Sequence, residues 1–462
     1  MVSDDLSFAT VVELGRMLRD GRATPTRLAE HFLERLERVG RPLNAVVNLT
    51  PELAREQARQ AEAEFAAGVD RGPLHGVPYG AKDLLATAGI PTTWGAAPYR
   101  DQVFDRDAVV VERLRAGGAV LVAKLAMVEL AGGFGYEQAD AAFTGPGRNP
   151  WDLEAWAGGS SSGSGAAVAA GAVPFAIGSE TWGSITTPAA LCGVTGLRPT
   201  YGRVSRRGAM ALAWTMDKIG PIARTAEDCA LVLAAIAGPD PEEPTTADRA
   251  LAEDPRRDGF RFAMLRGATV GAQPAVAANF EGAVAVLREI GTVEEVDLPD
   301  LPFDAAAAVV VVAEAAAAFE EFIVSGRNAG LTAPEDRVGL YGALALPAVD
   351  YLRALRVRRL GGRALDEVLR PYDAMAAPTL AAVAGPLTER FSAYFEDNRE
   401  ATLGGAGNLC GLPAITVPNG FGERGLPTGL ELMGRADDEH HILAAARAFQ
   451  ARTDWHLRRP ER

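Results

Sequence analysis

The fold of this chain is decided by the stretch GGSSSGSG at 158–165, which runs directly into AAVAAG at 166–171. Glycines at this density let the backbone turn tightly and take positive φ at several positions. The alanines and the valine that follow predict a short, closely packed helix that ends at Gly171. The serines would then lie where a loop enters a helix, beside free backbone N–H groups and the positive end of the helix dipole.

A second serine-bearing turn, GSETWGSI at 178–185, follows the apolar run at 173–177. Serine is a poor nucleophile until a neighbouring base takes its proton, and an attacked carbonyl needs N–H donors for its developing negative charge. Two glycine–serine turns on one short segment supply hydroxyls and exposed backbone donors together. The segment therefore predicts a hydroxyl nucleophile with an oxyanion hole.

Two other interpretations compete for the first glycine–serine stretch. Taken alone, the stretch is as typical of a flexible linker as of a site. A linker has polar flanks, however, whereas Trp156 and an alanine-rich helix flank this stretch. A phosphate-binding loop would continue with Gly-Lys-Ser/Thr, and Ala166 and Ala167 stand there instead.

The G-x-S-x-G elbow of α/β-hydrolases is also present, at 159–163. That motif requires an acid and then a histidine further along the chain. The later histidines are His440, His441 and His456, which are near the C-terminus and close to charged residues. This context predicts a surface position for them, so a histidine-based triad is disfavoured.

Three separated stretches, in the right order, resemble the motifs of the amidase signature family. The glycine–serine segment continues into CGVTGLRPTYGRVS at 192–205, GPLHGVPYGAKD at 72–83 resembles the lysine motif, and NLCGLPAITVP at 408–418 resembles the C-terminal strand. The resemblance runs from about the first helix to 455–456. Because the resemblance covers nearly the whole chain, the protein is identified as a member of this family.

The resemblance implies a Ser–cis-Ser–Lys triad, with Ser184 as the nucleophile, Ser160 as the bridging serine after a cis peptide and Lys82 as the base. Lysine can act as a base only when it is neutral, and burial favours the neutral form. Lys82 has the apolar neighbours that such burial needs, and Asp83 would point to the opposite face of a strand. Without the serine motifs, a surface lysine in a salt bridge would be the better interpretation.

The resemblance also implies an oxyanion hole and a set of substrate contacts. The oxyanion hole would consist of the backbone N–H groups of Thr181, Trp182, Gly183 and Ser184. Substrate contacts would come from Met127, Gly132, Gly133, Phe134 and Trp182. The implied chemistry needs no metal and no organic cofactor.

The nucleophile turn departs from the family pattern in two ways. The usual Asp-x-Gly-Gly-Ser is replaced by Glu180-Thr181-Trp182-Gly183-Ser184, and Thr186 stands where many members carry arginine. The tryptophan restricts φ and places a large ring beside the reaction centre, while the lost cation removes a partner for carboxylates. Both changes favour an apolar substrate over a charged amino-acid amide. An equal alternative is that Glu180 and Thr186 only shape the turn.

Composition limits the classes of binding partner and the cellular compartment that we expect for this protein. The 462 residues have a formal net charge of −14, which argues against nucleic acid and against anionic membranes as partners. The three cysteines, Cys192, Cys229 and Cys410, are widely spaced and predict free thiols without a disulfide or zinc site. No basic N-terminal region and no apolar run of about 20 residues is present, so we expect a cytoplasmic protein.

Alternating helical and strand-like segments predict an α/β fold: one large domain whose mixed, twisted β-sheet is covered by helices on both faces. Residues 1–70 are expected to form a helical region packed on the core, as packing or homodimer surface, and 71–462 the amidase signature domain. A specificity insertion is expected near 300–350, an exposed acidic excursion over 240–258 and a solvated basic helix face over 353–363. Helices are expected over 7–21, 25–39, 51–67, 108–117, 276–290 and 305–323, and strands over 119–123, 260–265 and 292–296.

The sequence therefore predicts an amidohydrolase that cleaves small, neutral and fairly apolar amides. Aryl and alkyl amides and anilides are favoured, with carbamates (urethanes) and esters as extensions. An alternative hypothesis is the glutaminase A subunit of a tRNA-dependent amidotransferase, which the chain also resembles. A non-catalytic binding protein is disfavoured because Lys82, Ser160 and Ser184 are all present.

Overall fold

The computed structural model describes residues 6–395 and 402–461, and one mixed sheet of 11 strands runs through this part of the chain. The strands are β1 (Val46–Leu49), β2 (Pro78–Lys82), β3 (Val120–Leu125), β4 (Phe175–Glu180), β5 (Thr195–Arg198), β6 (Lys218–Ala223), β7 (Phe260–Leu265), β8 (Gly291–Val296), β9 (Ala374–Pro378), β10 (Ala414–Phe421) and β11 (Pro427–Met433). Their order across the sheet is β1-β3-β2-β4-β6-β5-β10-β11-β9-β7-β8. The strands expected over 119–123, 260–265 and 292–296 are confirmed as β3, β7 and β8.

Strand direction changes several times across the sheet. Strand β2 is parallel to both of its neighbours, β3 and β4, and β7 is parallel to β8 and β9. The strands between these two groups pair antiparallel, as does β1 at the edge. Because neighbouring parallel strands end at the same edge of a sheet, the ends of β2 and β4 meet there.

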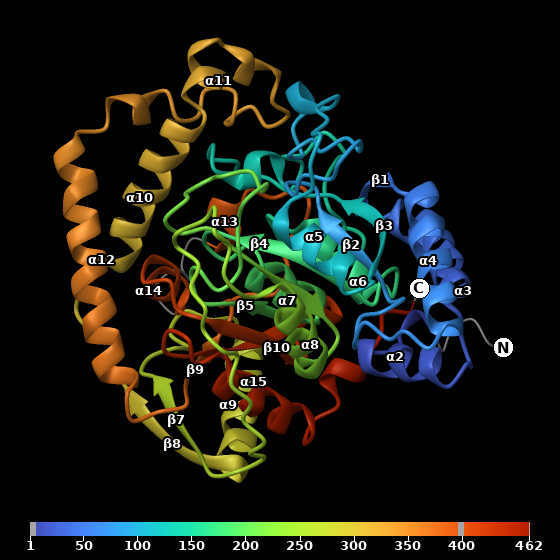
Figure 1. The fold of residues 1–462 in the computed structure, drawn as a ribbon. Helices are drawn as coiled ribbons and strands as arrows, with labels where there is room; N and C mark the ends of the chain where they lie inside the picture. The colour runs from blue at the N-terminus through green and yellow to red at the C-terminus, as the bar shows by residue number, and fades with distance from the viewer. Residues whose placement is uncertain (1–5, 396–401, 462) are drawn as a thin grey trace.

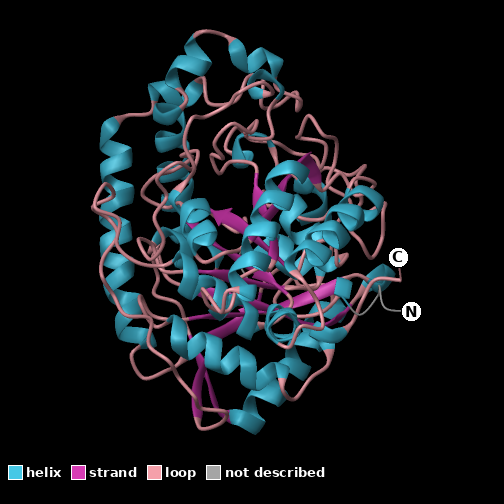
Figure 2. Cartoon of the chain, turned by 45° about the vertical axis from the view of Figure 1, so that its right-hand side comes forward, coloured by secondary structure: helices cyan, strands magenta, loops and turns pink. Residues whose placement is uncertain are grey.

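Helices surround the sheet, and the strands run through the middle of the molecule (Figures 1 and 2). The helices are α2 (Val11–Arg19), α3 (Pro25–Arg35), α4 (Pro51–Ala66), α5 (Val109–Ala116), α6 (Ser162–Ala169), α7 (Thr186–Cys192), α8 (Ala226–Ile236), α9 (Pro274–Ile290), α10 (Phe303–Ala318), α11 (Glu320–Val324), α12 (Ala348–Leu369), α13 (Phe391–Phe395), α14 (Gly404–Leu409) and α15 (Glu439–Gln450). This arrangement confirms the predicted α/β fold class. None of the described helices is long and apolar enough to cross a membrane.

The first helices begin where their caps dictate. Thr10 and Glu13 form a reciprocal capping box, so the regular helix starts at Val11 and not at residue 7 as expected. Thr24 accepts a bond from the next turn, and Pro25 occupies the first helical position of α3. The region 1–70 also contributes β1, which pairs with β3, so it adds a strand to the sheet as well as helices.

The helix expected over 305–323 is divided in two. Helix α10 ends at Ala318, and α11 begins at Glu320. The break falls at Phe319, whose buried ring packs edge-on against Trp94 and Phe134. Burial of these aromatic rings therefore outweighs helix continuity. Helices α10 and α12 run side by side at the edge of the molecule (Figure 1).

The acidic stretch 240–258 is a loop that is exposed along most of its length, as expected, but some of its acidic side chains are not. Asp240 and Glu243 are buried, because the guanidinium groups of Arg207 and Arg206 pair with them. The basic face expected over 353–363 is solvated only in part, since Arg358 is partly buried and donates to Thr215 Oγ1 over 2.7 Å. Local charge could not reveal these pairings, which join segments far apart in the chain.

The three cysteines are free thiols, as predicted: Cys192 and Cys229 are buried, and Cys410 is partly so.

Helix α6 lies at the centre of the molecule, and all of its residues are buried. The predicted helix after the glycine–serine stretch is thus confirmed, although it begins at Ser162. Gly163 packs directly against the backbone of two other segments: a Cβ added there would lie 2.5 Å from Ala126 N and closer still to Ala45 O. Only glycine leaves room for that approach.

We expect Gly163→Ala to destabilise the protein by about 3 kcal/mol, because backbone atoms cannot move aside for the new methyl group. The matched control is Gly282→Ala on α9, where nothing lies within 4 Å of an added Cβ. That change should stabilise the protein by up to about 1 kcal/mol through helix propensity. Urea unfolding of both variants checks the pair, and equal midpoints would contradict the packing argument.

Candidate active site

The ends of β2 and β4 bring Lys82 and Ser179 together. Ala81 and Ile177 are partners in the parallel register, so the next residues of both strands share one edge of the sheet. Lys82 Nζ lies 2.7 Å from Ser160 Oγ and 2.9 Å from Ser179 Oγ. The lysine and the first serine that the sequence selected are therefore in contact. Ser179 was not selected, although it stands in the second glycine–serine turn.

Ser160 and Ser184 lie on adjacent loops, each just before a helix. The peptide bond between Gly159 and Ser160 is cis, as the resemblance implied. Ser161 N–H donates to Ser184 O over 3.3 Å and so joins the two loops. Among the described residues no hydrogen bond links the Ser160 and Ser184 hydroxyls themselves, and Ser184 is 8% exposed.

Burial sets the protonation state of Lys82. Complete removal from solvent lowers the pKa of Lys82 to about 7, and the more distant charges of Asp217 and Glu180 only partly oppose this shift. A substantial neutral fraction is then present near pH 7. Asp83 takes no part, because it lies 3.1 Å from Lys124 Nζ in a separate buried ion pair. The prediction that Asp83 points away from the serines is confirmed.

Hydrogen bonds to both carboxylate oxygens of Glu180 fix the turn that carries Ser184, residues 180–186. One carboxylate oxygen accepts from the N–H groups of Ile185 and Thr186 at 2.8 and 2.9 Å. The other accepts from Arg198 Nη1 at 2.8 Å and from Asn408 Nδ2 at 2.9 Å. Although burial opposes ionisation, Arg198 and the other donors lower the pKa of Glu180 to about 2. Glu180 is a positioning residue of this turn, and Thr186 belongs to the same turn.

The turn leaves a row of backbone donors unoccupied. The N–H groups of Trp182, Gly183 and Ser184 donate to no other described residue, whereas those of Ile185 and Thr186 are taken by Glu180. Gly183 has φ +82°, which a side chain would strain. Successive free N–H groups in such a turn suit an oxyanion. The resemblance implied an oxyanion hole of these three N–H groups and that of Thr181.

A cavity of 710 Å³ opens at Ser184. The residues that line it are mostly apolar: Ala131, Gly132, Gly133, Tyr136, Trp156, Gly159, Thr181, Trp182, Ser184, Thr187, Leu212, Asp304, Ala305, Ala308, Val311, Leu380, Ala381, Phe391 and Thr402. Three of the proposed substrate contacts, Gly132, Gly133 and Trp182, are among them. Met127 and Phe134 are not among them, and both side chains are buried.

A smaller cavity of 320 Å³ adjoins the first, and Ala131, Thr181 and Leu212 line both. Ser179 and Lys218 also line the smaller cavity. Ser179, which contacts Lys82, therefore borders open space. Trp182 and Asp304 line only the larger cavity.

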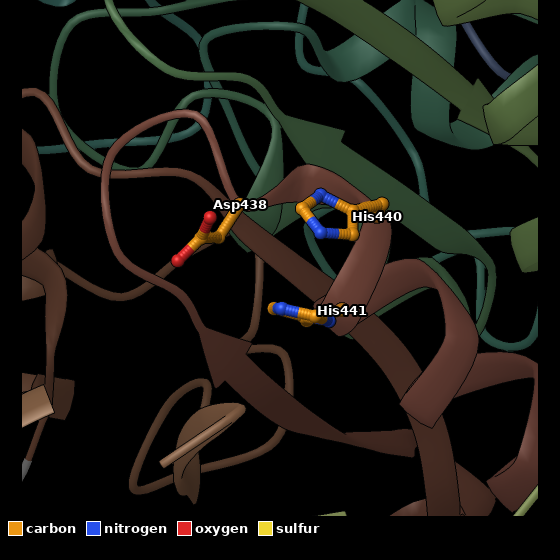
Figure 3. Close-up of side chains that lie close together, drawn as sticks. All are labelled: Asp438, His440 and His441. Atoms are coloured by element: carbon orange, nitrogen blue, oxygen red, sulfur yellow. The ribbon is translucent and has the colours of Figure 1, made fainter. Parts of the chain in front are cut away.

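One cluster with metal-ligand chemistry occurs in the described part of the chain, and none of its residues lines the cavity. The ligand atoms of Asp438, His440 and His441 lie within 4.8 Å of one another, with the two rings close together at the start of α15 (Figure 3). His441 Nδ1 is already 2.9 Å from Asp254 Oδ2 and 3.0 Å from Arg256 Nη2. The Arg256 guanidinium opposes a cation there, and serine chemistry at Ser184 requires none.

Comparison with known proteins identifies relatives along the whole chain. The family model described as Amidase matches residues 27–443. The A subunit of the glutamyl-tRNA(Gln) amidotransferase of Moorella thermoacetica is 40% identical over 99% of both chains.

Solved structures share the fold as well. The peptide amidase of Stenotrophomonas maltophilia superposes with a TM-score of 0.86 at 32% identity, over 98% of each chain. A structure described as a vestigial protein complex that reveals the evolutionary origins of an s-triazine catabolic enzyme gives a TM-score of 0.88 at 32% identity. It covers 96% of this chain and 98% of that one.

We expect Glu180→Gln to destabilise the protein by about 3 kcal/mol, because it leaves the Arg198 guanidinium buried without its carboxylate partner. The folded pKa of Glu180 is depressed, so its contribution to stability is present above about pH 4.5 and is lost as the pH falls towards 2. Urea midpoints at pH 7 and at pH 3 measure both effects. Thr186→Val, which removes only a 3.3 Å hydroxyl contact, is the control and should cost about 1 kcal/mol. Equal midpoints for Glu180→Gln and the wild type would contradict this role.

Proposed function

Because the chain belongs to the amidase signature family, we propose that it hydrolyses amide C–N bonds through an acyl-enzyme formed on Ser184. The observation that carries this proposal is the contact of buried Lys82 with Ser160 over 2.7 Å, beside the Ser184 loop and its free N–H groups. A base, a relay hydroxyl, a nucleophile and oxyanion donors are thereby available together, and the nucleophile Ser184 lines the cavity. Serine acyl transfer needs these four parts.

The proposed reaction has two halves. Neutral Lys82 takes a proton from Ser160 as Ser160 takes one from Ser184, and Ser184 Oγ attacks the carbonyl carbon while the N–H groups of 182–184 stabilise the oxyanion. The relay then returns the proton to the departing nitrogen, the C–N bond breaks and an ester remains on Ser184. Water attacks this ester with the same relay as base, which releases the carboxylic acid and restores the serine.

The lining of the cavity favours neutral, fairly apolar amides as substrates. Alanine, leucine, valine, tryptophan and phenylalanine side chains form most of its described wall. Aryl and alkyl amides and anilides match such a surface, and carbamates and esters offer a carbonyl that Ser184 would attack in the same way.

A second candidate function is that of a glutaminase that works in a complex with other chains. The 40% identity to the A subunit of an amidotransferase favours it, and on the relatives alone it stands ahead of an apolar-amide hydrolase. Glutamine, however, carries an α-carboxylate that arginine or lysine commonly pairs with. The described residues that line the cavity include neither. The two candidates share the same catalytic residues and differ in their substrate.

Both candidate functions are tested by measuring hydrolysis with the purified protein. The four substrates are glutamine, a short aliphatic amide, a nitroanilide and a nitrophenyl carbamate. We expect turnover of the neutral substrates to fall at least about 10³-fold in Ser184→Ala and in Lys82→Ala, because each removes a member of one catalytic unit. Ser162→Ala is the control, since its hydroxyl faces Ala126 O and not Lys82.

The pattern across the panel separates the candidates. Turnover of glutamine alone would favour the glutaminase, and full activity in Ser184→Ala would contradict both.

We further expect kcat/KM to rise with pH through about 7 and to level off above it. The sign follows from the base: burial depresses the pKa of Lys82, and only the neutral amine accepts the serine proton, so activity falls about tenfold per pH unit below 7. The buried Lys218 also has its pKa lowered to about 7, so Lys218→Met is the control and should keep the same limb. A profile that is flat between pH 6 and 9, or a limb that is lost in Lys218→Met, would contradict the assignment to Lys82.

A further inference from the structure

Three aromatic side chains form one corner of the cavity at Ser184. Tyr136, Trp156 and Phe391 all line this cavity. The Tyr136 ring stands edge-on to Trp156 and to Phe391, at centroid distances of 6.3 and 5.4 Å, and the Trp156 and Phe391 rings are tilted at 4.4 Å. Aromatic rings prefer edge-to-face and offset contacts with further rings, so this aromatic corner favours an aryl group over other apolar groups.

Packing places the aromatic corner beside the backbone of the relay serine. Gly159 immediately precedes Ser160, and a Cβ added at Gly159 would lie 2.8 Å from Trp156 Cζ2. A Cβ added at Gly132 would overlap the Tyr136 ring. Both glycines line the cavity as well. The two rings therefore close directly against the cavity wall that contains the reacting groups.

Tyr136 adds a hydroxyl group to the aromatic corner. Among the described residues this hydroxyl has no hydrogen-bond partner, and its oxygen is not enclosed, so it borders open space. Burial raises the pKa of the Tyr136 phenol far above neutrality, and the neutral phenol can both donate and accept a hydrogen bond. A partly buried polar group without a partner carries a free-energy cost that a hydrogen bond to a ligand removes.

We propose that Tyr136, Trp156 and Phe391 form a subsite for a substituted aryl ring of the substrate, in which Tyr136 Oη bonds a polar ring substituent. The inference rests on the proposed amide hydrolysis and narrows its substrate class. Preferred substrates are amides of aryl-alkyl acids or of aryl-alkyl amines whose ring carries a hydroxyl, ether or carbonyl group.

The cavity has room for such a substrate. An apolar cavity of about 150 Å³ holds a benzene ring. The 710 Å³ at Ser184 therefore accommodates an aryl group together with the rest of the amide. Phe391 makes a further contact within the chain, and the proposal needs it only as an apolar wall.

Pairs of substrates that differ only in the ring test the aromatic preference. One pair is 3-phenylpropanamide with 3-cyclohexylpropanamide, and the other is N-benzylacetamide with N-(cyclohexylmethyl)acetamide. In neither pair is the ring conjugated to the amide, so the intrinsic reactivity of the C–N bond is matched. Because only the aryl ring gains edge-to-face contacts, the wild type should favour it in kcat/KM by about fivefold in at least one pair.

Phe391→Leu keeps an apolar side chain but removes one ring from the corner. We expect the aryl preference to fall to about twofold or less, with the loss seen mainly as a higher KM for the aryl substrate. Phe104→Leu is the control, because Phe104 is also partly buried and packs on Trp94 but does not line the cavity. An equal loss of preference in both variants would overturn the assignment to this corner.

Tyr136→Phe tests the hydroxyl and keeps the ring. In the preferred pair, a hydroxyl at ring position 3 or 4 of the aryl substrate should raise wild-type kcat/KM by about fivefold, and Tyr136→Phe should abolish this gain through KM. Tyr99→Phe is the control, since it removes a partly buried phenol hydroxyl that does not line the cavity. A gain that survives in Tyr136→Phe would overturn the role of Tyr136 Oη.

The wild-type measurements alone decide the proposal if a variant does not fold. An aryl preference near one in both pairs, with amide hydrolysis intact, would overturn the subsite. Absence of hydrolysis of every amide would instead overturn the proposed function.

Discussion

The active site depends on a lysine that is buried without an anion in contact. Two lysines end up wholly buried on neighbouring parallel strands, and their partners set them apart. Lys124 has the carboxylate of Asp83 at 3.1 Å, whereas Lys82 has only the hydroxyls of Ser160 and Ser179 within 3 Å. A buried ammonium is costly unless it is paired, so the neutral amine is favoured at Lys82. A carboxylate placed beside Lys82 would keep it charged, and it could not then act as the proposed base.

A second buried charged group, the carboxylate of Glu180, fixes the turn that carries Ser184. The Glu180 carboxylate is buried but fully engaged, and it ties the start of α7 to Arg198 on β5 and to Asn408 on α14. It occupies the N–H groups that follow Ser184, whereas those at 182–184 have no acceptor among the described residues and would be available to the proposed oxyanion. Positioning of the turn and availability of the oxyanion donors thus have one physical cause.

Similarity to known proteins does not identify the substrate that this cavity accepts. A relative named as part of an amidotransferase and a solved peptide amidase both cover nearly the whole chain, so the fold alone does not select a substrate. Selectivity would arise locally in the cavity, whose described wall is mostly apolar and includes the ring of Trp182. In the proposed reaction Lys82, Ser160 and Ser184 act on the reacting bond, whereas the cavity wall would contact the rest of the substrate.

The sequence by itself predicted the α/β class, strands β3, β7 and β8, several of the helices, and Lys82, Ser160 and Ser184 as candidate catalytic residues, because hydrophobic period, helix caps and sequence motifs can be read from the chain alone. It did not determine that Ser179 contacts Lys82, that α10 breaks at Phe319 or that Asp304 lies in the cavity. Those facts depend on the parallel register of β2 with β4 and on the packing of α10 against α14. Only the tertiary structure decides them, because each contact joins segments whose separation in the chain carries no local signal.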